Sequence, residues 1–273
     1  MELDIYSLGL MAVGLLIAGS VAGILAGLLG VGGGIIIVPV LLEFFAVTGV
    51  DPAVRTHLAV GTSLATIIAT SISSIRSHHK RGGVDWSLWR LLAPSVAIGV
   101  ILGTLTASQS PGSVLALTFA AVALAAAGYL LLFPEGIAQG DRKPGGPIIG
   151  GCGVAIGALS TMIGIGGGTM TVPTLVFFGT PVRRAIGTSA AVGLIIAVIG
   201  CVGFIVAGFG KDGLPPLSFG YVSLIGCAAI VPTTVVTAPI GAWLAHRLSP
   251  ILVKRLFAAF LTVAALRLIA TNI

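Results

Sequence analysis

The sequence predicts an all-α polytopic membrane protein of about ten transmembrane segments, which form two inverted five-helix repeats with discontinuous or re-entrant helical hairpins. Three observations predict this fold class. Hydrophobic residues make up 56% of the chain and charged residues only 8%, whereas about a quarter of a soluble domain is charged. Long tracts carry no charged side chain, for example between Asp4 and Glu43. A segment with a triple glycine occurs twice in apolar sequence, at residues 30–34 and 164–168.

The apolar tracts divide into ten segments in the order of the chain. The tract from residue 5 to 42 would be about 57 Å long as one straight helix, which is nearly twice the thickness of a membrane core. It must therefore turn, and the glycines at 30–34 permit the turn. The segment after each glycine cluster is short, so each is expected to form a hairpin that returns to its starting side. The expected segments are 7–28, 33–47, 57–78, 87–108, 113–133, 148–163, 167–180, 185–208, 217–245 and 251–271.

The second half of the sequence repeats the first. Residues 59–63 (AVGTS) match residues 185–189 (AIGTS), and residues 119–121 (FAA) match residues 257–259. Each repeat contains five segments, an odd number, so the second copy enters the membrane from the opposite side. The expected parts are a first membrane repeat at 1–134, a cytoplasmic linker at 135–147 and a second membrane repeat at 148–273.

The basic residues indicate the orientation of the chain in the bilayer. The bias favours an outside amino terminus, so both termini are expected to be extracellular or periplasmic. Only Arg55, Lys211 and Arg267 then lie outside. The net charge of +6 therefore reflects orientation in a lipid bilayer and does not indicate a surface for nucleic acid. The basic residues expected on the cytoplasmic side are Arg76, Lys80, Arg81, Arg90, Arg142, Lys143, Arg183, Arg184, Arg247, Lys254 and Arg255.

The sequence argues against a signal peptide, a disulfide framework and a metal site. The amino terminus reads Met-Glu-Leu-Asp, which is acidic, so a first membrane segment is expected there. Cys152, Cys201 and Cys227 lie in apolar tracts without paired spacing. We expect them to be small buried residues and not metal ligands.

The two glycine clusters predict a central anion-binding site. A helix that begins after such a cluster has amide donors without intrahelical partners, and its dipole places about half a positive charge there. Two such starts, facing each other near mid-bilayer, would bind one small anion without a lysine. Where the first half has Ile35 and Ile37, the second half adds two threonine hydroxyls. The alternative is that the glycines only allow close helix packing. The predicted residues are Gly30, Gly32, Gly33, Gly34, Gly164, Gly166, Gly167, Gly168, Thr169 and Thr171.

A second matched pair of motifs is the Gly-Thr-Ser sequence near the start of each third segment. Its hydroxyls are expected to donate to the oxygens of an anion, or alternatively to bond back to the backbone one turn earlier. Their repetition beside the glycine clusters favours a role in lining the substrate site. The residues are Gly61, Thr62 and Ser63 in the first half and Gly187, Thr188 and Ser189 in the second.

Four charged or titratable residues are candidates for gating or coupling. His57 and Arg183 each lie four residues before a Gly-Thr-Ser glycine, near opposite faces, where they would draw an anion into an entrance with the help of Arg55. His57 titrates near neutral pH, so it is the first candidate for proton coupling, and Glu43 is the second. The alternative is that these are ordinary interfacial residues that set topology.

The motifs exclude most enzyme classes and predict no cofactor. The buried segments contain no acidic pair, no HExxH motif, no Ser/His/Asp arrangement and no Walker-type loop. A membrane-embedded enzyme is therefore disfavoured, and the chain is expected not to be an enzyme. An anion channel stays open as an alternative, because it would use the same helix dipoles along a continuous pore.

The glycine segments with their Val-Pro sequences, both Gly-Thr-Ser motifs and the stretch at 245–250 (AHRLSP) resemble the TauE/SafE family of sulfite exporters. The resemblance covers nearly the whole chain. It implies an inner-membrane secondary transporter for sulfite, sulfonate or another small sulfur-containing anion. It further implies alternating access driven by protons or another coupling ion. By this resemblance, the glycines at 30, 32–34, 164 and 166–168 fall on motif positions of the family. It leaves the exact substrate, the direction of transport and the oligomeric state open.

Overall fold

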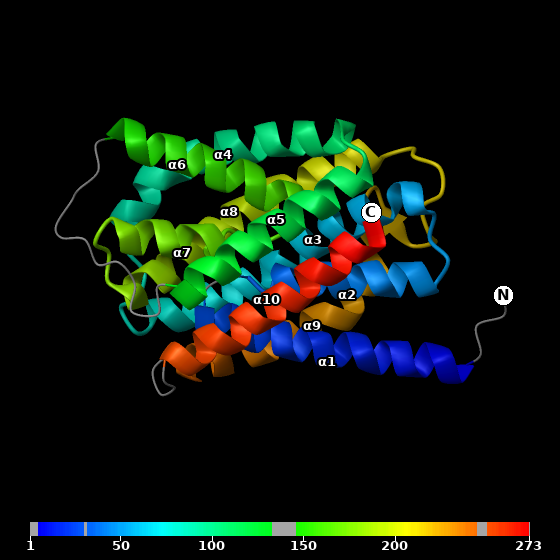
Figure 1. The fold of residues 1–273 in the computed structure, drawn as a ribbon, viewed down its shortest axis with the longest axis horizontal. Coiled ribbons are helices and arrows are strands. Elements are labelled where there is room, and N and C mark those ends of the chain that lie inside the picture. Colours follow the sequence, from blue (N-terminus) through cyan, green and yellow to red (C-terminus); the bar gives the residue numbers. More distant parts are fainter. Residues whose placement is uncertain (1–4, 30–31, 133–145, 245–249, 273) are drawn as a thin grey trace.

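The structure of the chain is a computed structural model that describes residues 5–29, 32–132, 146–244 and 250–272. These residues form ten α-helices and one small β-hairpin (Figure 1). Most of the expected linker at 135–147 lies outside the described residues. The helices are α1 (Ile5–Leu29), α2 (Gly34–Val47), α3 (Pro52–His79), α4 (Trp86–Gln109), α5 (Gly112–Leu132), α6 (Gly146–Met162), α7 (Gly168–Phe177), α8 (Val182–Gly208), α9 (Leu224–Leu244) and α10 (Pro250–Asn272).

Each of the ten helices overlaps one expected segment, with boundaries that differ by up to five residues, as at the start of α3, except for one larger difference. The segment expected at 217–245 begins too early, because residues 218–223 form a hairpin of β1 (Ser218–Phe219) and β2 (Val222–Ser223). Gly220 has a φ of 55° and supplies the left-handed position that the tight turn requires. Helix α9 therefore begins only at residue 224.

The helices differ in their ability to cross a membrane. Helices α3, α4, α5, α8 and α9 are long and apolar enough to span it. Helix α2 has 14 residues and α7 has 10. At about 1.5 Å per residue, both are shorter than a hydrocarbon core of about 30 Å. Neither is therefore long enough to cross the hydrocarbon core as a straight helix.

Helices of one half pack mainly against helices of the other half. Helix α1 packs along α9, and α6 packs along α4. Helices α3 and α8 contact each other in the middle of the bundle, and α5 packs against α10 (Figure 1). Gly27 of α1 and Gly99 of α4 lie directly against the backbones of Ala238 and Val154. Small residues that let helix backbones approach closely are typical of packing in membranes.

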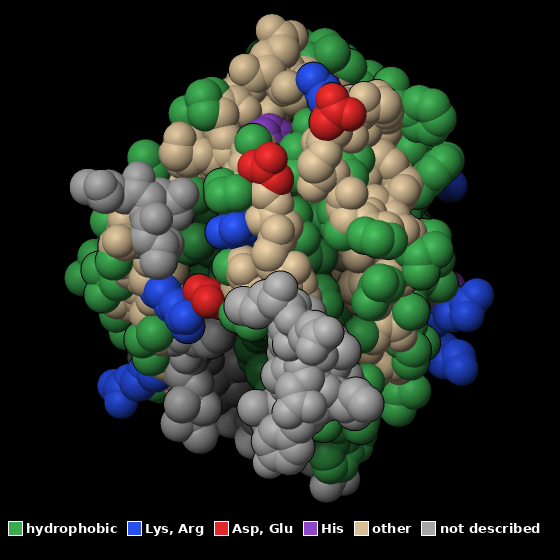
Figure 2. All heavy atoms as spheres, turned by 90° about the vertical axis from the view of Figure 1, so that its right-hand side faces the viewer, with side chains coloured by type: hydrophobic (Ala, Val, Ile, Leu, Met, Phe, Trp, Pro, Cys, Tyr) green, Lys and Arg blue, Asp and Glu red, His purple; other side chains and the backbone are tan. Residues whose placement is uncertain are grey.

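The distribution of side chains on the surface fits a bilayer. Val198, Val202 and Val206 follow each other along α8 at a spacing of four residues, and all three are exposed. Such an exposed apolar row is costly in water and favourable in lipid. Acidic and basic side chains gather on the end of the bundle where α1 begins and α10 ends (Figure 2). The sides of the bundle are thus apolar and at least this end is charged.

Candidate functional site

Both glycine clusters interrupt a helix in the structure. Helix α2 begins only at Gly34 and α7 only at Gly168. The residues directly before them, Gly33 and Gly167, have φ angles of 80° and 62°. Glycine adopts this left-handed region without strain. Neither helix start has a side-chain cap, so no side chain offsets the positive end of either helix, which favours a bound anion. The predicted residue Gly30 lies outside the described residues.

The two breaks lie against each other beside the middle of α3. The carbonyl group of Gly164 lies directly against Gly34, where any side chain would clash with it. A Cβ atom on Gly32 would lie 3.2 Å from the Cα atom of Gly166 and 3.0 Å from the side chain of Ile67 on α3. The absence of side chains therefore permits this contact, and the glycines do act in packing here.

The amide groups of the second break are engaged in this conformation. The N–H group of Gly167 donates to the carbonyl oxygen of Ile165 at 2.8 Å, and that of Gly168 donates to Gly166 at 2.5 Å. Both bonds reach back only two residues along the chain. An anion at the start of α7 would have to replace these bonds.

The two threonines of the second break carry hydroxyl groups without a partner. Thr169 is 8% exposed and Thr171 is 0% exposed. Neither hydroxyl has a hydrogen-bond partner among the residues that the structure describes. A Cβ atom on Gly167 would lie 3.6 Å from the Thr171 Oγ1 atom, so this hydroxyl lies close to the break. Ile35 and Ile37, the counterparts in the first half, are buried too. The site is therefore polar on one side only.

The Gly-Thr pair of the first half holds a loop of the second half. The N–H group of Ser223 donates to the Thr62 Oγ1 atom at 2.9 Å. The carbonyl group of Tyr221 lies directly against Gly61. The loop between α8 and α9 is thus fixed to α3. We call this contact the first latch.

The second half repeats the same contact at the other end of the bundle. The N–H group of Asp85 donates to the Thr188 Oγ1 atom at 2.9 Å. The carbonyl group of Gly83 lies directly against Gly187. This second latch fixes the loop between α3 and α4 to α8. Both threonine hydroxyls therefore accept a loop amide, and their use as substrate ligands stays a prediction.

The serines of the two motifs have different partners. The Ser63 hydroxyl donates to the Gly164 carbonyl oxygen at 2.8 Å, so it reaches the glycine break directly. The Ser189 hydroxyl donates to the Ile186 carbonyl oxygen of its own helix at 2.7 Å. Ser63 thus joins α3 to the second break.

His57 lies beside the first latch and is buried. Its Nε2 atom is 3.1 Å from the carbonyl oxygens of both Ala107 and Ser110, at the end of α4. Its ring stacks on that of Tyr221, with centroids 5.1 Å apart. The Nδ1 atom has no hydrogen-bond partner among the described residues. His57 therefore connects α3, the end of α4 and the latched loop.

Glu43 and Arg55 lie away from the breaks. Glu43 forms a 3.0 Å ion pair with Arg267, and both side chains are largely exposed. Arg55 donates from Nε and Nη2 to the carbonyl oxygen of Val50 at 3.2 and 2.7 Å. Arg55 thus fixes the turn between α2 and α3, and Glu43 joins α2 to α10.

Arg183 is exposed at the start of α8 and lines a pocket at the end of the bundle opposite His57. The pocket has a volume of about 270 Å³. Three arginines line it, and none of the described residues in its lining is acidic. We call it the basic pocket. Its lining consists of His78, Arg81, Gly82, Gly83, Pro181, Arg183, Arg184 and Ile186.

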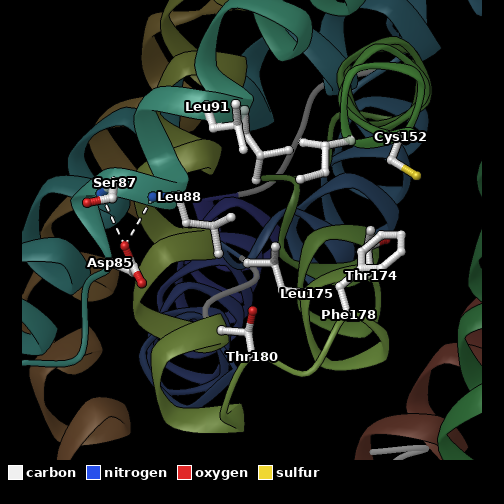
Figure 3. Close-up of a pocket in the computed structure, with 11 residues that line it drawn as sticks. Asp85, Ser87, Leu88, Leu91, Cys152, Thr174, Leu175, Phe178 and Thr180 are labelled. Atoms are coloured by element: carbon white, nitrogen blue, oxygen red, sulfur yellow. Dashed lines mark hydrogen bonds between the residues drawn. The ribbon is translucent and has the colours of Figure 1, made fainter. Parts of the chain in front are cut away.

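A larger hollow of about 610 Å³ lies between α4, α6 and α7 (Figure 3). Leu88 of α4 and Leu175 of α7 point into it. The Asp85 carboxylate at its rim accepts hydrogen bonds from the amides of Ser87 and Leu88 at 3.1 and 3.0 Å. An apolar lining and a carboxylate both disfavour an anion, so this hollow is not the candidate site.

Sequence reasoning missed two residues on α3, Ser71 and Ser74. Both are 1% exposed, and neither hydroxyl has a partner among the described residues. A Cβ atom on Gly193 would lie 3.5 Å from the Ser71 Oγ atom and 2.6 Å from the Gly166 carbonyl oxygen. Ser71 therefore lies beside the second break. The signal was available in the sequence, since hydroxyl residues recur along α3 at helical spacing.

Comparisons of the sequence with known proteins identify its family. A family model described as sulfite exporter TauE/SafE matches residues 15–268. A probable membrane transporter protein of Haemophilus influenzae is 36% identical over 93% of this chain and 96% of its own length. One from Methanocaldococcus jannaschii is 30% identical over 83% of this chain and 81% of its own length. No solved structure matches the chain.

These matches extend over almost the whole bundle, both glycine breaks and both latches included. The relatives are named as transporters and not as enzymes. The chain therefore belongs to the TauE/SafE sulfite exporter family of membrane transporters, and it is a multi-pass membrane protein.

Proposed function

We propose that this chain is a secondary transporter that moves a small sulfur-containing anion, such as sulfite or a sulfonate, by alternating access. The anion binds between the two glycine breaks. One observation carries the proposal. Two helix starts without side-chain caps, one from each half, meet beside the middle of α3, next to the unpartnered hydroxyls of Thr169 and Thr171. Uncapped helix starts attract an anion, and hydroxyl groups donate to its oxygens.

The two halves form an inverted pair in this proposal. The packing of equivalent helices supports it. Helix α1 packs on α9 of the other half, just as its counterpart α6 packs on α4. The two latches support it as well, because the same Gly-Thr contact recurs at opposite ends of the bundle. Alternating access requires one gate at each end, and the latches provide them. The described conformation has both latches closed, which corresponds to an occluded state.

The family match supports the substrate class, and the basic residues support the orientation. The membrane is the cytoplasmic membrane, and both termini lie outside the cytoplasm. Protons or another ion drive the transport, with His57 as the first candidate for coupling because it is buried beside the first latch. Arg183 lies at the opposite entrance.

The test is electrogenic transport by the purified protein in proteoliposomes on a solid-supported membrane. We expect currents with sulfite, sulfoacetate or taurine that saturate with concentration, and no current with empty liposomes. Flux that rises without saturation would indicate a channel instead. The absence of both current and counterflow for all three compounds would contradict the proposed substrate class.

A further inference from the structure

Helix α3 carries a continuous row of buried polar side chains from the glycine breaks to the end of the helix. Apart from the adjacent Thr70 and Ser71, successive members are three or four residues apart, so the row keeps to one side of the helix. Each is at most 4% exposed. Polar groups in an apolar membrane interior are costly unless they are bonded or serve a function. The row consists of Ser63, Thr66, Thr70, Ser71, Ser74 and His78.

The row changes character halfway along. The Ser63 hydroxyl donates to Gly164 at 2.8 Å, and the hydroxyls of Thr66 and Thr70 donate to carbonyl groups of α3 itself at 2.7 and 3.0 Å. Ser71 and Ser74 follow them toward the end of α3, and their hydroxyls have no partner in the part of the chain that the structure describes. A serine in a helix normally bonds back to its own backbone. The hydroxyl groups of Ser71 and Ser74 do not, and their position on one face indicates that they bind another partner.

The unpaired part of the row begins at the second glycine break. Ser71 and the Gly166 carbonyl group both lie against Gly193 of α8. Ser74 lies one turn further along α3. His78 follows one more turn beyond Ser74, and it is not part of the unpaired stretch, because its Nε2 atom is 2.9 Å from the carbonyl oxygen of Gly27. His78 lines the basic pocket. The row therefore leads from the candidate anion site to that pocket.

The basic pocket has the charge expected at the mouth of an anion path. Arg81 reaches it from the α3 end, and Arg183 and Arg184 reach it from the start of α8. Pro181, which precedes α8, provides no side-chain cap. By contrast, Asp51 caps the start of α3 through a 2.9 Å hydrogen bond from Ala53. The start of α8 thus keeps its positive helix end for a ligand, whereas the start of α3 is neutralised by its own carboxylate.

We propose that this face of α3 is the path of the anion between the glycine breaks and the basic pocket, with Ser71 and Ser74 as hydroxyl donors along it. The ligand of this path is an oxyanion. Only the identity of that anion depends on the proposed transport function. The path is closed in the described conformation, because both serine hydroxyls are buried. The second latch closes it, since Gly83 of the latched loop also lines the pocket. Opening requires this loop to leave α8.

Cysteine accessibility in membrane vesicles tests the path. The background is a variant with Ala at positions 152, 201 and 227, which removes the three native thiols. In this background, the variants Ser71→Cys and Ser74→Cys are treated with a membrane-impermeant methanethiosulfonate reagent that has a sulfonate head. Ser95→Cys is the matched control, because Ser95 is a partly buried serine of α4 whose hydroxyl bonds back to Leu92 at 2.9 Å. Lys80→Cys, exposed at the end of α3, reports which vesicle orientation presents the basic pocket.

We expect Ser71→Cys and Ser74→Cys to react only in the orientation in which Lys80→Cys reacts, at least ten times faster than Ser95→Cys. Arg183→Gln combined with Arg184→Gln should slow the reaction at position 74 about fivefold, with no slowing for a cationic reagent of similar size. Arg90→Gln, an exposed arginine outside the pocket lining, should not slow it.

Absence of labelling at both positions, or equal labelling at position 95, would overturn the path. Sulfoacetate should protect positions 71 and 74 from the reagent. Labelling with the expected sidedness but without this protection would keep the path and contradict sulfoacetate as the transported anion. The two proposals therefore fail separately.

Discussion

The hydroxyl group of Ser63 on α3 donates a 2.8 Å hydrogen bond to the carbonyl oxygen of Gly164, two residues beyond the end of α6. Gly164 has a φ of 68°, so the chain turns sharply at this residue. The donor and the acceptor belong to different halves of the sequence. This bond therefore ties the central helix of one half to the glycine break of the other.

Replacement of Ser63 by Ala should destabilise the contact between the halves. The change leaves a buried carbonyl group without its partner, which costs about 1–3 kcal/mol. Thermal unfolding in detergent, followed by intrinsic fluorescence, should show a lower Tm. Ser108→Ala is the control, because this exposed serine only bonds back to Leu105. An equal Tm for both variants would show that the Ser63 bond contributes nothing.

Two matched substitutions, one at each latch, should each loosen a different loop. Thr62→Val and Thr188→Val keep the shape of the side chain but remove the acceptor for Ser223 and for Asp85. We expect faster amide hydrogen exchange around residues 217–224 in the first variant and around residues 82–88 in the second. Each variant is the control for the other. Faster exchange in the same segment for both would contradict two independent gates.

The positions of the helices could be predicted from the sequence because they depend on local properties. Charge-free tracts and glycine clusters determine where a membrane helix runs and where it breaks, and the breaks before Gly34 and Gly168 followed from this alone. The boundary at residue 217 was wrong, because a two-residue turn at Gly220 and Tyr221 competes with the helix and an apolar pattern does not show it.

The partners of the polar side chains could not be predicted in the same way. Thr62 finds its donor in Ser223, far away in the other half of the sequence. Whether a membrane serine bonds to its own helix or stays unpaired depends on neighbours that only the packing reveals. Ser71 and Ser73 look equivalent in the sequence, yet Ser73 donates to Val235 at 3.0 Å and Ser71 has no partner among the described residues.

Substitution of the threonines beside the second break should separate binding from stability. Thr169→Val with Thr171→Val removes two buried hydroxyls that have no protein partner among the described residues. No hydrogen bond to the described residues is lost, so the Tm of the variant should stay the same or rise. If these hydroxyls bind the anion, the apparent affinity for it should fall about tenfold, since a charge-assisted bond contributes more than about 1.4 kcal/mol.

The control for this pair is Thr161→Val. Thr161 is equally buried, but its hydroxyl already donates to Gly157 at 2.8 Å. Its replacement should leave the affinity unchanged, since the group is not free to bind a ligand. The measurements are transport currents as a function of anion concentration and thermal unfolding. Unchanged affinity in the Thr169 and Thr171 double variant would exclude these hydroxyls from the site.

His57→Gln and Glu43→Gln distinguish the two candidates for proton coupling. Glu43 pairs with Arg267 on the exposed surface, and such a pair contributes about 0–1 kcal/mol. Its replacement should change neither the stability nor the response to a pH gradient. His57 is buried, with Nε2 against the end of α4 and its ring on Tyr221 of the first latch. A glutamine there keeps a donor for the Ala107 carbonyl group but cannot take up a proton.

We therefore expect His57→Gln to retain exchange of labelled anion across the membrane at equal pH, because this exchange needs binding and opening but no net proton movement. The same variant should lose the accumulation that an imposed gradient of one pH unit produces in the unmodified protein. Counterflow and pH-driven uptake in the same proteoliposomes measure both quantities. If Glu43→Gln and not His57→Gln removes the pH-driven uptake, the coupling proton moves along the α2–α10 surface and the first latch is not where the gradient acts.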